Sequence, residues 1–108
     1  MIDIQVQDFS LTEAMKAHIK QKLEPMHSNF GDRILSTHVH LSDVNGPKGG
    51  ENKKCLIHVE LQKLPTVVVE DTQGSLYTSI DNSCHSAMRA VRKSLERQQT
   101  LARKQTNL

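Results

Sequence analysis

Two segments of the chain carry apolar residues at helical spacing, and four shorter segments alternate between apolar and polar residues. The longer helical pattern runs from Leu76 to Gln99, with apolar residues at i, i+4, i+8 and i+11. The shorter one follows Phe9 and reaches Met26. The apolar stripe expected on the first helix comprises Leu11, Met15, Ile19, Leu23 and Met26, and that on the second comprises Leu76, Ile80, Cys84, Ala87, Met88, Val91 and Leu95.

Local signals predict where the first helix begins and ends. Ser10 and Glu13 match a capping box, in which the serine hydroxyl accepts from the amide at Glu13 and the carboxylate reaches back. Pro25 lacks an amide hydrogen and disfavours helical geometry at Glu24. We therefore expect the helix to end or kink at Pro25.

The alternating segments predict strands over residues 2–7, 35–44, 55–62 and 66–70. The side chains expected to face the core from the two middle strands are Leu35, Thr37, Val39, Leu41, Cys55, Ile57, Val59 and Leu61. The opposite face of these strands is polar and carries His38, His40 and His58. This alternation is typical of a sheet with one buried and one solvated face.

The element order is therefore β-α-β-β-β-α. The first connection is long enough for a crossover that sets the first two strands parallel, and the remaining strands form an antiparallel meander. Because each helix has one apolar stripe, both should pack on the same sheet face. We predict an α+β fold with a four-stranded mixed sheet, formed by residues 1–102 as one domain, and a frayed basic tail at residues 103–108.

Composition narrows the classes of function. No apolar run approaches about 18 residues, so no membrane span is expected, and the start of the chain lacks the pattern of a signal peptide. Cys55 and Cys84 lie on core stripes, which favours reduced thiols and a cytoplasmic protein. Aromatic residues make up only 3% of the chain, which leaves little for stacking on bases.

The charge of the second helix points to a binding role. Residues 86–108 hold six basic residues and one acid, a local net charge of +5, whereas a solvated helix face normally mixes its signs. A long loop rich in Gly and Lys, at residues 45–54, is either a simple hairpin connection or a second element that contacts phosphates. The residues expected to contact phosphates are Arg89, Arg92, Lys93 and Arg97 of the helix and Lys48, Lys53 and Lys54 of the loop.

The sequence gives little support for metal binding or catalysis. The three histidines and Glu60 share a face, but zinc prefers closed sets of His, Cys and acid ligands, and both cysteines point away. Cys84 lies on the core stripe, so it is a poor nucleophile beside His85. No catalytic pattern or nucleotide fingerprint stands out. We expect no metal, no cofactor, no small-molecule substrate and no enzymatic activity.

The second helix opens with Leu-Tyr-Thr-Ser-Ile-Asp at residues 76–81, after a strand that ends Val-Val-Val-Glu-Asp. This resembles the D-x-Y-x-A-I-D opening of the last helix in ribosome hibernation promoting factors. That family is also called ribosome-associated translation inhibitors or sigma-54 modulation proteins. Residues 9–15 and the element order fit the same family. Arg89 and Lys93 coincide with basic family positions, whereas Ser75, Ser86 and Ala90 replace Asp, Lys and Gln.

The resemblance implies a short, divergent member that binds the small ribosomal subunit, as a monomer, against 16S rRNA and silences translation under stress. It does not say whether such binding pairs ribosomes or idles single ones. A second hypothesis, from another class, is a regulator that binds a protein such as a sigma factor through the open sheet face. Binding to ribosomes that salt weakens favours the first hypothesis, and salt-insensitive capture of a protein favours the second.

Overall fold

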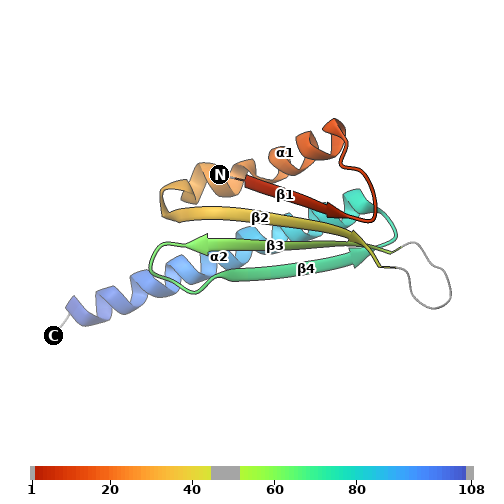
Figure 1. Ribbon diagram of the computed structural model, residues 1–108. Helices are drawn as coiled ribbons and strands as arrows, with labels where there is room; N and C mark the ends of the chain where they lie inside the picture. Colours follow the sequence, from red (N-terminus) through yellow and green to blue (C-terminus); the bar gives the residue numbers. More distant parts are fainter. Residues whose placement is uncertain (1, 45–51, 107–108) are drawn as a thin grey trace.

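The computed structural model describes residues 2–44 and 52–106, which form two layers, a sheet and a pair of helices (Figure 1). The strands are β1 (Ile2–Gln7), β2 (Ile34–Asp43), β3 (Lys53–Leu61) and β4 (Val67–Gln73). The helices are α1 (Glu13–Phe30) and α2 (Leu76–Thr106), with a short 3-10 turn, η1 (Gly31–Arg33), after α1. The predicted β-α-β-β-β-α order is confirmed.

The sheet is mixed and has the strand order β1-β2-β3-β4. β1 pairs in parallel with β2, so that Ile4 lies opposite Val39, and the other neighbours pair antiparallel. Both helices cover the same face of the sheet, as predicted (Figure 1). No helix within residues 2–44 and 52–106 lies over the other face, and we call it the open face.

The core lies between the helices and the sheet. On α1 the buried residues are Ile19, Leu23 and Met26, and Met15 packs at the margin together with Leu11, which precedes the helix. On α2 the predicted stripe is confirmed, with Met88 and Leu95 at its edges. The fully buried residues of the α2 stripe, with the sheet residues that meet the helices, are Ile80, Ala87, Val91, Thr37, Val39, Cys55, Ile57 and Val59.

The predicted helix cap at Ser10 is wrong. Thr12 is the cap, with extended backbone angles (φ −93°, ψ 160°), and its hydroxyl accepts from the amide of Met15 at 3.1 Å. The helix therefore begins at Glu13, three residues after Ser10. Both hydroxyl residues suit a cap, and the extended backbone and the hydroxyl-to-amide bond occur at Thr12.

Pro25 does not end α1, which continues to Phe30. A proline inside a helix removes one hydrogen bond and crowds the preceding turn. Here the turn that follows is held by tertiary contacts. Met26 is fully buried, and the His27 imidazole bridges the Leu23 carbonyl and the Thr37 hydroxyl of β2.

The start of β2 also differs from the alternating pattern. Leu35 is 59% exposed instead of facing the core. The register between β2 and β3 shifts between Ile34 and Ser36, which marks a bulge that turns the extra residue outward. Alternation predicts which side chains face the core only where every residue of the strand is paired. The bulge breaks this pairing, so the prediction that Leu35 faces the core is wrong.

The last helix is longer than expected. α2 reaches Thr106, beyond the predicted end at Gln99, and its last turns project past the sheet (Figure 1). The backbone of residues 103–106 is thus helical where we expected a frayed tail. The boundary of the domain at residue 102 stays a prediction.

The cap of α1 can be tested by substitution. Thr12→Ala should lower the free energy of unfolding by about 1 kcal/mol, because the Met15 amide loses its acceptor at the helix start. Ser10→Ala is the matched control and should change it little. Urea unfolding followed by circular dichroism measures both. A larger loss for Ser10→Ala than for Thr12→Ala would return the cap to Ser10.

His27 is a second structural group with a measurable signature. Its Nδ1 lies 3.2 Å from the Leu23 carbonyl, which can only accept, so Nδ1 carries the hydrogen. In the neutral ring Nε2 then accepts from Thr37 Oγ1 at 3.0 Å. Desolvation by burial lowers the pKa of His27 below its usual 6.5, although the hydrogen bond to Leu23 opposes this.

A depressed histidine pKa in the folded state makes stability depend on pH. The contribution of neutral His27 is fully present above pH 6.5 and is lost as the pH falls below 6.5 toward the lower folded pKa. We expect His27→Gln to lose less unfolding free energy than the wild type between pH 7.5 and pH 5.5. Urea titrations at the two pH values measure this difference. Equal losses in the two proteins would show that His27 is not held neutral.

Candidate nucleic-acid interface

α2 places its cations on the surface away from the sheet. Arg89 and Lys93, four residues apart, stand on the crest of the helix, opposite the buried Ile80, Cys84 and Val91. Both crest residues are exposed. The burial of the apolar stripe therefore fixes the direction in which these two charges point.

Arg92 and Arg97 stand on opposite flanks of the same helix. Arg92 lines a hollow with Phe30 and Arg33, at the end of α1. Arg97 lines another with Pro65 and Val67, beside the turn between β3 and β4. The four predicted α2 cations therefore form a curved surface and not a single row.

The crest carries a shallow depression between its charges. Ser86 and Ala90 line it, together with Arg89, Arg92 and Lys93. These are the two positions at which the family resemblance expects Lys and Gln. Their small side chains leave room for a phosphate oxygen to approach the neighbouring guanidinium and ammonium groups.

The α2 cations lack acidic partners among the residues that the structure describes. None of the ion pairs within 4.0 Å in this part of the chain includes Arg89, Arg92, Lys93 or Arg97. Glu96 lies on the same helix without pairing any of them. An unneutralised cationic surface of this kind attracts polyanions.

The predicted lysines of the loop are placed differently. Lys53 and Lys54 belong to β3, and each pairs with an acid: Lys53 with Asp43 at 2.8 Å, and Lys54 with Glu70 at 3.1 Å. Lys53 also lies over the Phe9 ring, 5.2 Å from its centroid. Both lysines are therefore partly neutralised within the protein. Lys48 lies outside the described residues.

Arg33 joins the candidate surface, although the sequence analysis did not single it out. It follows α1 in η1, and its Nη2 donates to Gln98 Oε1 of α2. It also shares the hollow that Arg92 lines. Arg33 and Gln98 are far apart in the sequence, so no local pattern could have brought them together.

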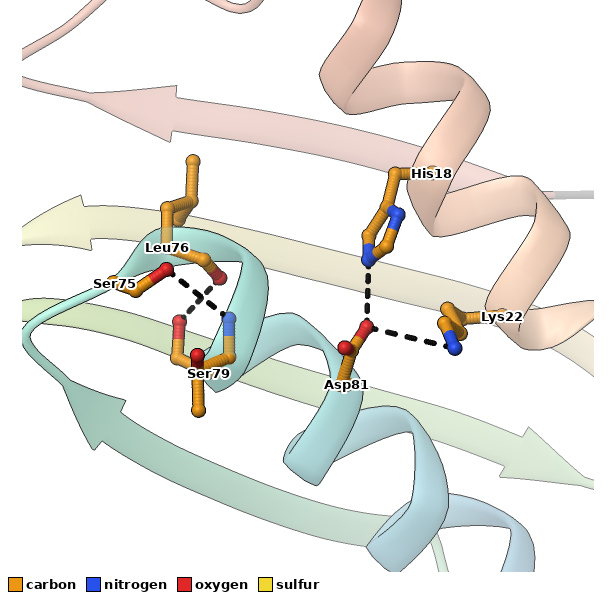
Figure 2. Close-up of polar contacts among 7 residues, drawn as sticks. His18, Lys22, Ser75, Leu76, Ser79 and Asp81 are labelled. Carbon is orange, nitrogen blue, oxygen red and sulfur yellow. Dashed lines mark hydrogen bonds and ion pairs between the residues drawn. The ribbon is translucent and has the colours of Figure 1, made fainter.

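The motif that carries the family resemblance has a structural role (Figure 2). His18 of α1 points at Asp81 of α2, with Nε2 2.6 Å from Oδ1, and Lys22 approaches the same oxygen at 3.9 Å. The Tyr77 ring meets His18 edge-on, with 4.8 Å between ring centroids. Tyr77 and Asp81 thus join the two helices.

Two serine side chains form hydrogen bonds with backbone groups at the start of α2 (Figure 2). Ser75, where the family pattern has Asp, accepts from the Thr78 amide at 3.5 Å, and Ser79 donates to the Leu76 carbonyl at 2.8 Å. Asp71 of β4 accepts from the Asn82 side chain of α2 at 3.0 Å. The opening of α2 is therefore anchored to β4.

The histidine face shows hydrogen bonding instead of a closed ligand set. His38 lies between two carboxylates, 3.6 Å from Asp3 and 3.6 Å from Glu60, and Ser36 donates to Glu60 at 2.8 Å. In the part of the chain that the structure describes, no three His, Cys, Asp or Glu side chains are grouped as metal ligands would be.

The two thiols are unpaired and buried, as predicted. Desolvation by burial raises the pKa of Cys55 to about 11 and that of Cys84 to about 12. A thiol is nucleophilic only as the thiolate, so both cysteines are inert at neutral pH. They serve as small apolar residues of the core.

Fold and surface together define a two-layer α+β domain that presents a long cationic helix. A model of the family described as sigma 54 modulation protein / S30EA ribosomal protein matches residues 2–99, so the chain belongs to this family. That result confirms the resemblance seen in the sequence. No curated protein sequence matches the chain significantly.

Solved structures share the fold at low identity. The chain is similar to the N-terminal domain of Protein Y from Thermus thermophilus, with a TM-score of 0.72 and 23% identity, over 84% of this chain and 93% of that one. It is also similar to a ribosomal subunit interface protein from Coxiella burnetii, with a TM-score of 0.73 and 17% identity, over 85% and 93% of the two chains. Across the described ranges, no helix has the length and apolar character that a membrane span needs.

The thiols provide a test of the packing. We expect Cys55 and Cys84 to react with Ellman's reagent at pH 8 only slowly in the native protein, and fully in urea, because burial keeps both protonated and covered. Cys55→Ser and Cys84→Ser variants assign the rates. Rapid modification of either thiol before unfolding would contradict its place in the core.

Proposed function

We propose that this protein binds the small ribosomal subunit by setting the exposed face of α2 against 16S rRNA, and that binding inhibits translation in the cytoplasm. One observation carries the proposal. The four α2 cations are exposed and free of acidic partners in the described structure, opposite a buried stripe that holds them in place. Membership of the sigma 54 modulation protein / S30EA ribosomal protein family supports the ribosome as the partner.

The residues of the proposed contact should contribute unequally to the affinity for RNA. Arg89 and Lys93 on the crest reach furthest from the core, while Arg92 and Arg33 extend the surface toward α1. Lys53 and Lys54 should contribute less, because a phosphate would have to compete with Asp43 and Glu70.

Two further points support rRNA as the anion. The α2 surface is curved, with cations on both flanks, and such a surface suits an irregular RNA backbone that approaches from more than one side. The guanidinium groups of arginine form paired hydrogen bonds with phosphate oxygens, and three of the four α2 cations are arginines.

Salt dependence tests the α2 contact. Each neutralised phosphate of non-duplex RNA contributes a slope of about −0.7 to log affinity against log salt, so about four to six contacts should give about −3 to −4. Replacing Arg89 and Lys93 by Ala should weaken binding to small subunits and reduce the slope by about 1.4. Pelleting with purified small subunits at several salt concentrations measures both quantities.

The matched control keeps both charges. Arg89→Lys combined with Lys93→Arg should retain the slope of the wild type, since the number of neutralised phosphates is unchanged. Both positions are exposed, so unfolding free energies should stay within about 0.5 kcal/mol of the wild type. If the alanine variant binds with the wild-type affinity and slope, α2 does not contact RNA. Binding that salt does not weaken would favour a protein partner instead.

A further inference from the structure

The open face of the sheet carries two imidazole rings side by side on its central strands. His40 projects from β2 and His58 from β3, and their ring centroids are 6.1 Å apart with the planes tilted by 47°. His40 is paired with Leu56 in the sheet register and His58 with His38, so the two rings are diagonal neighbours. Both rings are partly exposed.

These rings line a hollow that extends across three strands. Its other lining side chains include the amides of Gln5 and Gln7 on β1, the hydroxyl of Ser42 and the ammonium of Lys54. Leu56 lies between Lys54 and His58 along β3, opposite His40 in the sheet register. The hollow therefore combines flat rings with hydrogen-bonding groups and one cation.

Carboxylates are absent from the described lining of this hollow. Those of the neighbouring strands are engaged outside it: Asp3 and Glu60 flank His38, and Glu70 pairs with Lys54 at its margin. The open face is thus divided into an acidic half around His38 and a hollow whose one cation, Lys54, is paired with Glu70. The hollow therefore suits a ligand that presents flat rings and hydrogen-bonding edges.

We propose that this hollow binds an unpaired segment of ribosomal RNA, with bases stacked on His40 and His58 and their edges hydrogen-bonded by the amides of Gln5 and Gln7. Unpaired bases present both a ring surface and free hydrogen-bonding edges, which match the imidazoles and the Gln5 and Gln7 amides. A duplex hides those surfaces in its base pairs. The few aromatic residues of the chain are therefore supplemented by histidine rings.

The proposal rests on the proposed function for the identity of the RNA, and it adds a second surface on the other side of the molecule. α2 covers one side of the sheet (Figure 1). The side chains of His40 and His58, which line the hollow, project from the other side. The molecule measures only 17 Å along its shortest axis. A cleft lined with ribosomal RNA would therefore contact both sides at once.

The test uses a short probe that needs no ribosome. An eight-nucleotide RNA of adenosine and cytidine, which cannot pair with itself, is labelled with fluorescein and titrated with the full chain, with fluorescence anisotropy as the readout. A 12-base-pair RNA duplex is titrated in parallel. We expect the single strand to bind and its affinity to fall roughly fivefold to tenfold for each ring removed in His40→Ala and His58→Ala.

Three variants make the result specific. His40→Phe should restore the affinity, because it keeps a stacking ring and lacks the imidazole nitrogens. Gln62→Ala, at an exposed position after β3 and outside both the hollow and α2, is the control and should bind as the wild type does. In a protein that already carries Arg89→Ala and Lys93→Ala, removing either histidine ring should still lower the affinity for the single-stranded probe. Circular dichroism checks that each variant is folded, and the phenylalanine variant keeps the test open if an alanine variant is not.

The outcomes separate this proposal from the function of α2. Loss of single-strand affinity in the histidine variants, together with weaker binding of the same variants to small subunits, supports it. It is overturned if the probe does not bind, if the alanine variants bind as the wild type does, or if the duplex binds equally well through the rings. Probe binding without any effect on small subunits overturns the assignment to ribosomal RNA. Loss of subunit binding without probe binding would place a protein contact there.

Discussion

The burial of one apolar stripe of α2 against the sheet determines most of this structure. Ile80, Ala87 and Val91 are completely buried, and each large aliphatic side chain removed from water contributes about 1.5 to 3 kcal/mol. Rotating α2 about its axis would expose this stripe. The same constraint that forms the core therefore directs Arg89 and Lys93 away from it, and the candidate interface depends on core packing.

Charge pairing then separates the basic residues into two groups. Lys53 and Lys54 lie in strands beside carboxylates, and Lys53 with Asp43 is largely shielded from water. The α2 cations have no such partners in the described structure. A basic residue in the sequence is thus only a potential ligand for phosphate, because a neighbouring acid can satisfy it first.

The sheet has two faces with different chemistry. The face under the helices is aliphatic and holds both cysteines with raised pKa values. The open face holds imidazoles, amides and paired charges, arranged by the register of β1, β2 and β3. Between the helices, His18 and Asp81 form a link that fixes α1 beside α2. Tyr77 and Asp81 of the family motif thus keep the two helices together, and α2 carries the cationic surface.

The sequence by itself determined the element order, the buried stripes and the sign of the α2 surface, because periodicity and charge are local properties of the chain. It did not predict that Thr12 and not Ser10 caps α1, that α1 continues past Pro25, or that Leu35 is exposed. These features depend on tertiary contacts and on a bulge in strand pairing. Only the tertiary structure joined Arg33 to Gln98 and brought His40 close to His58. Contacts between distant residues follow from how the layers pack, and no local pattern records them.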